Sequence, residues 1–191
     1  MQLLENPTTA SLPALTPRLV RRDPAASPRS WLTPGFGASA AFINLSPGLV
    51  CAFDGPAGEA VTHQELGAVG MTAHQAWNAV AEDLAPRAFR DTGVEFMVRP
   101  PSVALGTAHL PRGYEIGGHD CHPASWLAHP KTFTILHRHF ESVLQPAHEL
   151  VYLTRDGKDL FVFDGDVDTQ LPLPANASAV TYSVGFPLLR R

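Results

Sequence analysis

The sequence predicts an α+β domain, in which a largely antiparallel sheet built from hairpins has two main helices packed on one face. Short apolar runs occur in pairs separated by turn residues, and two longer segments carry apolar residues at helical spacing. Strands and helices do not alternate regularly along the chain. Paired strands favour an antiparallel sheet, whereas regular alternation would favour a parallel one.

The distribution of proline divides the chain into two parts. Six of the 18 prolines fall within the first 34 residues, and they leave no room for a helix longer than two turns. We therefore expect residues 1–30 to form a proline-rich N-terminal arm or tail. The remaining residues, 31–191, are long enough and apolar enough for a single α+β domain with one core.

The first half of that domain is predicted to contain a hairpin and a helix. Apolar runs at 41–45 and 49–53 flank Ser46-Pro47-Gly48, which is a turn sequence. A helix is expected from Thr72 to Pro86, because Thr72 and Gln75 form a capping-box pattern before residues of helical periodicity. A short helical turn at 63–66 precedes it.

The second half is predicted to return to strands around one long helix. Residues 94–99 alternate as a half-buried strand does, and 102–107 and 114–116 are weaker strand candidates. A helix is expected between Pro130 and Pro146, after a short helix at 123–127. Runs at 149–154 and 160–163 surround Asp156-Gly157 and predict a tight hairpin, and 179–184 supplies a last strand.

A histidine-rich stretch gives one hypothesis for a metal site. His119, Asp120, Cys121 and His122 are contiguous, and their side chains are of the types that zinc prefers. His137, on the following predicted helix, could supply another ligand. The spacing matches no zinc motif, so the alternative is that these histidines are caps or half-buried polar groups. Cys121 is also a candidate nucleophile, because histidines flank it.

Three aromatic residues give a second hypothesis. Trp77, Trp126 and Phe133 could line a ligand pocket between the sheet and the helices; the alternative is that they simply pack in the core. No phosphate-binding glycine motif and no nucleophile elbow occurs. No cofactor is therefore expected, apart from a divalent metal such as zinc under the first hypothesis.

Charge and cysteine content exclude other classes of protein. The net charge of −4 gives no general attraction to nucleic acid or to an anionic membrane, so neither is an expected partner. Two cysteines cannot form a disulfide framework, and no apolar run is long enough for a secretory signal or a membrane span. We expect a soluble, cytoplasmic protein with reduced thiols.

A helix with Ala76-Trp77, Ala81 and Leu84 is followed by Ala124-Ser125 and by a hairpin containing Arg155-Asp156 and the apolar run 160–163. This order, over residues 66–164, resembles an uncharacterised bacterial protein family of unknown function. The chain departs from it at Asp83, where that family usually has asparagine. The resemblance implies an α+β architecture and no activity, and the excess of arginine over lysine predicts a GC-rich bacterial genome.

Three functions remain open on the sequence alone. The first is a non-catalytic module that binds a protein or forms a homodimer through its N-terminal arm. The second is a metal-dependent, hydrolase-like enzyme using the cluster at 119–122. The third is a small-ligand-binding domain.

Overall fold

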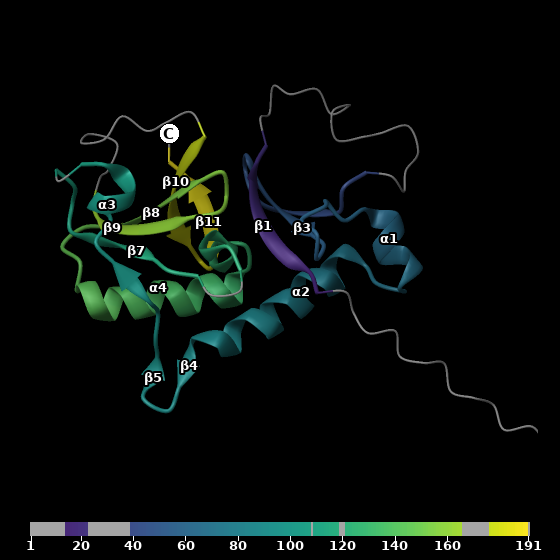
Figure 1. The fold of residues 1–191 in the computed structure, drawn as a ribbon, viewed down its shortest axis with the longest axis horizontal. Helices are drawn as coiled ribbons and strands as arrows, with labels where there is room; N and C mark the ends of the chain where they lie inside the picture. The colour runs from purple at the N-terminus through teal and green to yellow at the C-terminus, as the bar shows by residue number, and fades with distance from the viewer. Residues whose placement is uncertain (1–13, 23–38, 108, 119–120, 166–175, 191) are drawn as a thin grey trace, which may run out of the picture.

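Two antiparallel sheets organise the chain, with helices beside and below them in the view of Figure 1. The computed structural model describes residues 14–22, 39–107, 109–118, 121–165 and 176–190. Its mixture of helices and antiparallel strands confirms the predicted α+β class. Within the described residues, the strands fall into a three-stranded sheet, a six-stranded sheet and a small two-stranded hairpin.

The three-stranded sheet has the order β1-β3-β2 and is antiparallel throughout. It consists of β1 (Thr16–Arg21), β2 (Phe42–Ser46) and β3 (Leu49–Asp54). The predicted hairpin at 41–53 is therefore confirmed. β3 is apolar along most of its length because it is the central strand and is buried on both faces.

Strand β1 comes from the segment that the prolines assign to the N-terminal arm. Its Pro17 has no N–H to donate, and an edge strand is where a sheet tolerates proline. The Pro17 carbonyl accepts a hydrogen bond of 2.6 Å from Ser125 Oγ, and Leu19 is buried. The described part of the arm is thus a strand of the domain. The expected boundary at residues 30 and 31 lies outside the described residues.

The six-stranded sheet has the order β11-β10-β8-β9-β7-β6, again antiparallel. Its strands are β6 (Val98–Arg99), β7 (Gly113–Ile116), β8 (Leu150–Arg155), β9 (Leu160–Asp164), β10 (Ala177–Ser183) and β11 (Phe186–Leu189). The predicted hairpin is confirmed as β8–β9, and Asp156 and Gly157 at its turn have φ of 54° and 65°. The sequence pattern did not indicate β11.

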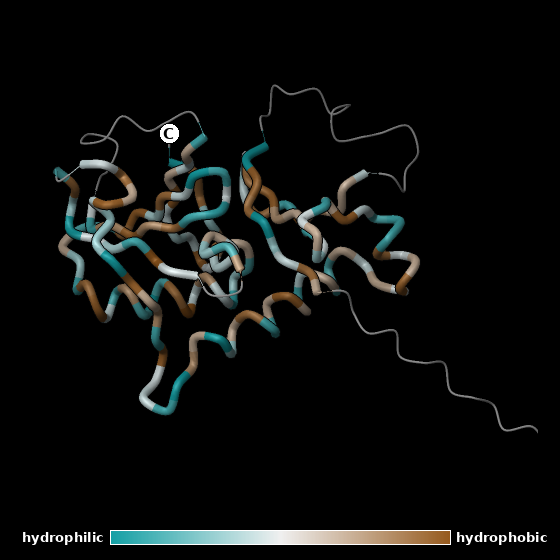
Figure 2. Tube along the Cα trace, viewed as in Figure 1, coloured by the Kyte–Doolittle hydropathy of each residue, from teal (hydrophilic) through white to brown (hydrophobic). Residues whose placement is uncertain are grey.

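The helices are α1 (His63–Ala68), α2 (Ala73–Leu84), α3 (Ser102–Leu105) and α4 (Pro130–Leu144), with 3-10 turns η2 (Ala85–Ala88) and η3 (Pro123–Leu127). The Thr72–Gln75 capping box and the start of α4 at Pro130 are confirmed. Apolar and polar residues alternate along α2 and α4 (Figure 2). Helix α4 packs its apolar side on the six-stranded sheet, while α2 contacts both α4 and β2.

Two predicted strands are wrong. Residues 94–99 are not one strand: β5 (Gly93–Val94) pairs with β4 (Phe89–Arg90), and the chain then crosses to β6. The crossing occurs because Phe96 packs on Trp126, with ring centroids 4.8 Å apart. The segment 102–107 forms α3 instead of a strand. Pro101 precedes this helix and Gly106, at φ 67°, ends it, as is typical of a short helix.

The opposite face of the six-stranded sheet has its own small core. Val151, Leu153, Phe161 and Phe163 lie there, and Ala104 and Leu105 of α3 pack against this cluster. Helical segments therefore lie on both faces of this sheet. Among the described residues, every helix is too short or too polar to cross a membrane.

Candidate functional site

Two of the predicted metal ligands can be placed. His122 is exposed and precedes η3, whereas His137 lies in the middle of α4. His119 and Asp120 lie outside the described residues. In the described ranges, no three His, Cys, Asp or Glu side chains are grouped so that they could hold a metal ion.

His137 belongs to a polar network inside the core. Its Nδ1 lies 2.9 Å from the hydroxyl of Tyr152, and its ring stacks on Tyr182 at 4.0 Å. Its Nε2 lies 3.5 Å from a carboxylate oxygen of Glu141. Burial lowers the pKa of His137, and the nearby carboxylates of Glu141 and Glu149 partly oppose this. Its imidazole therefore has partners within the core.

The three aromatic residues expected to line a pocket are separated by the fold. Trp77 donates a 2.7 Å hydrogen bond from Nε1 to the Ala128 carbonyl, and this bond ties α2 to the start of α4. Phe133 is fully buried and packs edge-on to Tyr152, with ring centroids 4.9 Å apart. Trp126 is different, because it lines a pocket.

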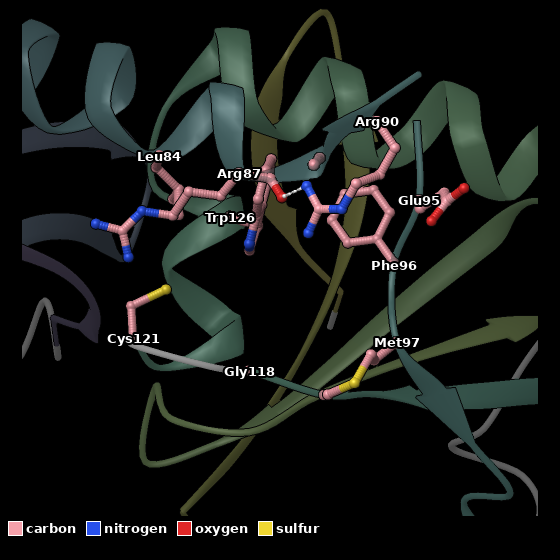
Figure 3. Close-up of a pocket in the computed structure, with 11 residues that line it drawn as sticks. Leu84, Arg87, Arg90, Glu95, Phe96, Met97, Gly118, Cys121 and Trp126 are labelled. Atoms are coloured by element: carbon pink, nitrogen blue, oxygen red, sulfur yellow. Dashed lines mark hydrogen bonds between the residues drawn. The ribbon is translucent and has the colours of Figure 1, made fainter. Parts of the chain in front are cut away.

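This pocket has a volume of about 420 Å³ and forms where three separate segments meet. They are the end of α2 with η2, the hairpin β4–β5 with the residues that follow it, and η3 with Gly117, Gly118 and Cys121, which lie between β7 and η3 in the sequence. We call it the arginine–tryptophan pocket. The side chains that the argument uses are Arg90, Phe96, Met97, Cys121 and Trp126 (Figure 3).

Arg90 is the charged group that the pocket presents to a ligand. Its Nη1 donates to the carbonyls of Arg87 and Phe89, at 3.0 and 2.9 Å, and Figure 3 draws the bond to Arg87. Within the described part of the chain, no carboxylate lies within ion-pair distance of Arg90. The Arg87 guanidinium, by contrast, pairs with Asp83 and points away from the centre of the pocket.

The other walls of the pocket are apolar. Phe96 and Trp126 meet edge to face at 79°, and the thioether of Met97 lies below them in Figure 3. Glu95 also lines the pocket, but it accepts a hydrogen bond from Thr92 and its carboxylate points away from Trp126. The described lining thus combines one fixed cation with two aromatic faces.

The two cysteines lie in different environments, and neither forms a disulfide. Cys51 is fully buried in β3, and burial raises the pKa of its thiol far above the usual range. Cys121 is partly exposed and lines the arginine–tryptophan pocket, with its sulfur directed toward the interior (Figure 3). No histidine is among the described residues that line this pocket.

Comparison of the chain with protein-family models, with curated proteins and with solved structures gave no match. The resemblance over residues 66–164 therefore remains a prediction.

Proposed function

We propose that this protein is a non-catalytic binding domain that takes a small organic anion with a flat apolar body in the arginine–tryptophan pocket. One observation carries the proposal: the Arg90 guanidinium, which donates to two backbone carbonyls, lines the same pocket as the aromatic rings of Phe96 and Trp126. The described lining offers no acid–base pair with which to attack a bond, so binding is the better supported role.

The geometry of Arg90 favours a carboxylate. Its Nη1 is occupied by carbonyls, whereas its Nε and Nη2 make no hydrogen bond to the described residues. This free edge carries two parallel N–H donors, which match the two oxygens of a carboxylate. Because the guanidinium is already held in place, little side-chain entropy is lost when the ligand binds.

The size and the walls of the pocket favour a flat ligand body. Pockets for drug-sized ligands range over about 300–1,000 Å³, and 420 Å³ lies toward the lower end of that range. Phe96 and Trp126 present aromatic surface for stacking, and Met97 adds a polarisable thioether. An aromatic carboxylate the size of benzoate meets both requirements.

Isothermal titration calorimetry with benzoate and with neutral benzamide tests the proposal. A hydrogen bond to a charged group contributes about 1.5–3 kcal/mol, so we expect Arg90→Gln to weaken benzoate binding by roughly 10- to 100-fold. Arg138→Gln is the matched control, because Arg138 is an exposed arginine of α4 outside the pocket. It should leave benzoate binding unchanged.

Benzamide should bind more weakly than benzoate to the unsubstituted protein. The two compounds should bind to the Arg90→Gln variant with about equal affinity. The proposal is overturned if benzoate does not bind, or if Arg90→Gln and Arg138→Gln reduce its affinity to the same extent. The second result would show that overall charge, and not this pocket, attracts the anion.

An exposed apolar surface near the pocket supports a second candidate, self-association of the chain. Phe89, Met97 and Val98 leave 52%, 51% and 44% of their areas exposed. Side chains of this kind are enriched where protein surfaces meet. Sedimentation velocity over a range of concentrations should show a dimer that Phe89→Ser weakens.

Deletion of residues 1–13, which leaves β1 in place, separately tests whether the N-terminal arm contributes to the dimer. A monomer at every concentration contradicts this candidate.

A further inference from the structure

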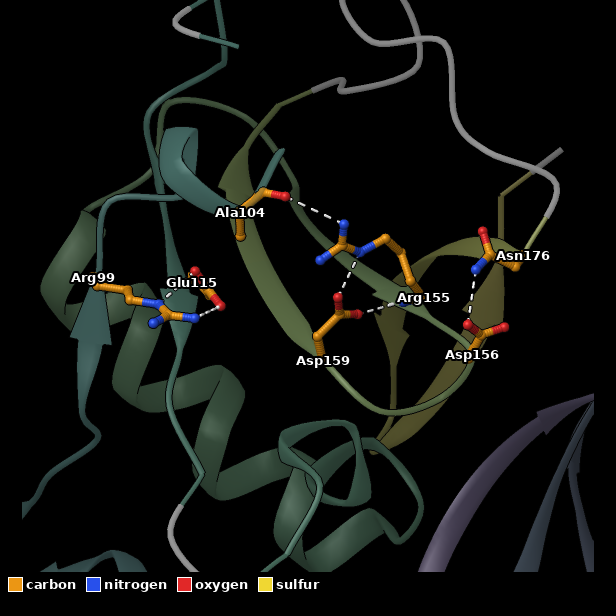
Figure 4. A network of polar contacts seen from close by, with 7 residues as sticks. All are labelled: Arg99, Ala104, Glu115, Arg155, Asp156, Asp159 and Asn176. Atoms are coloured by element: carbon orange, nitrogen blue, oxygen red, sulfur yellow. Dashed lines mark hydrogen bonds and ion pairs between the residues drawn. The ribbon is translucent and has the colours of Figure 1, made fainter. Parts of the chain in front are cut away.

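A second, smaller pocket lies between strand β1 and the end of the six-stranded sheet. Its volume is about 210 Å³, and it shares no lining residue with the arginine–tryptophan pocket. Strand β1 contributes Arg18, Leu19 and Arg21 to one wall. The opposite wall is made by β8, the β8–β9 turn and the start of β10, and we call this the β1–β8 pocket. Figure 4 shows that turn from close by, with Asp156 and Asn176.

Thr154 is an unusual residue of this pocket. It is 1% exposed, and its Oγ1 is a buried polar atom without a hydrogen-bond partner among the described residues. Ser178 lies directly opposite it in the β8–β10 register and is 8% exposed, so two hydroxyl-bearing residues are adjacent at this wall. An unpaired buried hydroxyl costs about 1–3 kcal/mol, and native proteins seldom retain one without a reason.

Strand β1 supplies the positively charged side chains that a negatively charged ligand needs. Arg18 directs its Nε to Asp54 at 2.8 Å, so its charge is paired, whereas Arg21 is exposed and forms no ion pair with the described residues. Asp156 is the acidic residue among the described lining. Asn176 Nδ2 donates to one of its oxygens at 2.8 Å, as drawn in Figure 4.

We propose that the β1–β8 pocket binds a phosphate group, either as the free anion or carried by a larger molecule. Hydroxyl donors from Thr154 and Ser178 and the guanidinium group of Arg21 would hold its oxygens. Asp156 can accept a hydrogen bond from hydrogen phosphate, whereas sulfate has no proton to donate at neutral pH. The pocket is therefore expected to bind phosphate more tightly than sulfate.

Thermal unfolding of the full chain in rising concentrations of inorganic phosphate, at constant ionic strength, tests this site. Potassium chloride keeps the ionic strength constant and serves as the nonspecific control, and sulfate is titrated in parallel. A ligand that binds only the folded state raises the free energy of unfolding by RT ln(1 + L/Kd), where L is the ligand concentration, so the unfolding temperature rises with the logarithm of the ligand concentration above Kd. We expect a rise with phosphate that follows this relation and a smaller rise with sulfate.

Two variants within the pocket and one control outside it test whether phosphate binds at this pocket. The valine side chain has nearly the same shape as that of threonine but lacks the hydroxyl. The Thr154→Val variant should therefore unfold at a higher temperature than the unsubstituted protein when phosphate is absent. It should weaken the apparent affinity for phosphate at least tenfold, and Arg21→Gln should do the same. Arg138→Gln, which lies outside the pocket, should behave as the unsubstituted protein does.

Phenyl phosphate distinguishes the two sources of the phosphate group. Tighter binding of phenyl phosphate than of inorganic phosphate indicates a group carried on a larger molecule, and the reverse order indicates the free anion. The proposal is overturned if phosphate does not raise the unfolding temperature above that in potassium chloride, if sulfate stabilises as much as phosphate, or if Thr154→Val retains the full phosphate response. Destabilisation by Thr154→Val without phosphate would also overturn it, because the hydroxyl would then have a partner within the protein.

Discussion

The contact between strand β1 and the β8–β9 turn can be tested by substituting one glycine. Gly157 has a φ of 65°, and a Cβ added there would overlap the backbone carbonyl oxygen of Leu19 in β1. Gly157→Ala therefore has two costs: a left-handed backbone conformation for alanine and the displacement of β1. Gly106→Ala is a matched control, because Gly106 has a φ of 67° and a Cβ there would meet no atom.

The expected magnitudes follow from these two costs. A residue with a Cβ in the left-handed region costs about 1–2 kcal/mol, so Gly106→Ala should lower the free energy of unfolding by that amount. Displacement of β1 would also expose Leu19, which is 4% exposed, and burial of a leucine side chain contributes about 1.5–3 kcal/mol. Gly157→Ala should thus cost about 3–5 kcal/mol in total.

Urea unfolding of both variants, followed by circular dichroism, measures the difference. We expect Gly157→Ala to be less stable than Gly106→Ala by about 2 kcal/mol. A difference below about 0.5 kcal/mol would mean that β1 does not lie against the turn, and that the N-terminal segment is not a strand of the domain.

Three further outcomes are expected. In the native protein a thiol reagent should modify Cys121 and leave the buried Cys51 unmodified until the protein unfolds; modification of both at equal rates would contradict the buried position of Cys51. Burial lowers the pKa of His137, so the unfolded state binds more protons than the folded state below about pH 6.5. The free energy of unfolding should therefore fall as the pH is lowered from about 7 to about 5. The fall should be less steep in His137→Gln. Ser125→Ala removes the donor to the Pro17 carbonyl and should lower the free energy of unfolding by about 1 kcal/mol in denaturant titrations; an unchanged value would show that this bond does not help to hold β1.

Local sequence signals were sufficient to predict most elements that have strong start and stop residues. The capping box at Thr72 predicted α2, Pro130 predicted the start of α4, and Asp156-Gly157 predicted the β8–β9 turn. Each of these signals acts within a few residues along the chain, so no knowledge of the tertiary fold was needed.

The elements that were missed depend on partners distant in sequence. Strand β1 lies in a proline-rich segment, and it is a strand because β3 pairs with it and because Leu19 is buried by the rest of the domain. The segment 94–99 alternates correctly for a strand, but the packing of Phe96 on Trp126 redirects the chain. Neither contact is visible in local periodicity.

The candidate site was predictable only in part for the same reason. Trp126 lines a pocket, but one whose described lining includes neither Trp77 nor Phe133, which are used for packing. No sequence motif marked Arg90 as a binding residue. Its proposed role depends on its hydrogen bond to the Arg87 carbonyl and on aromatic residues from other segments. Pockets assembled from separate segments leave no spacing pattern in the sequence.

The most direct test of the binding proposal is an NMR titration of the indole N–H resonances with benzoate. Trp126 lines the arginine–tryptophan pocket, whereas the Trp77 indole donates to Ala128 away from it, so the protein contains its own control. We predict that the Trp126 signal shifts saturably with benzoate while the Trp77 signal stays in place, and that Arg90→Gln abolishes the shift. Equal shifts at Trp126 and Trp77, or no saturable shift at Trp126, would contradict the assignment of this pocket as the binding site.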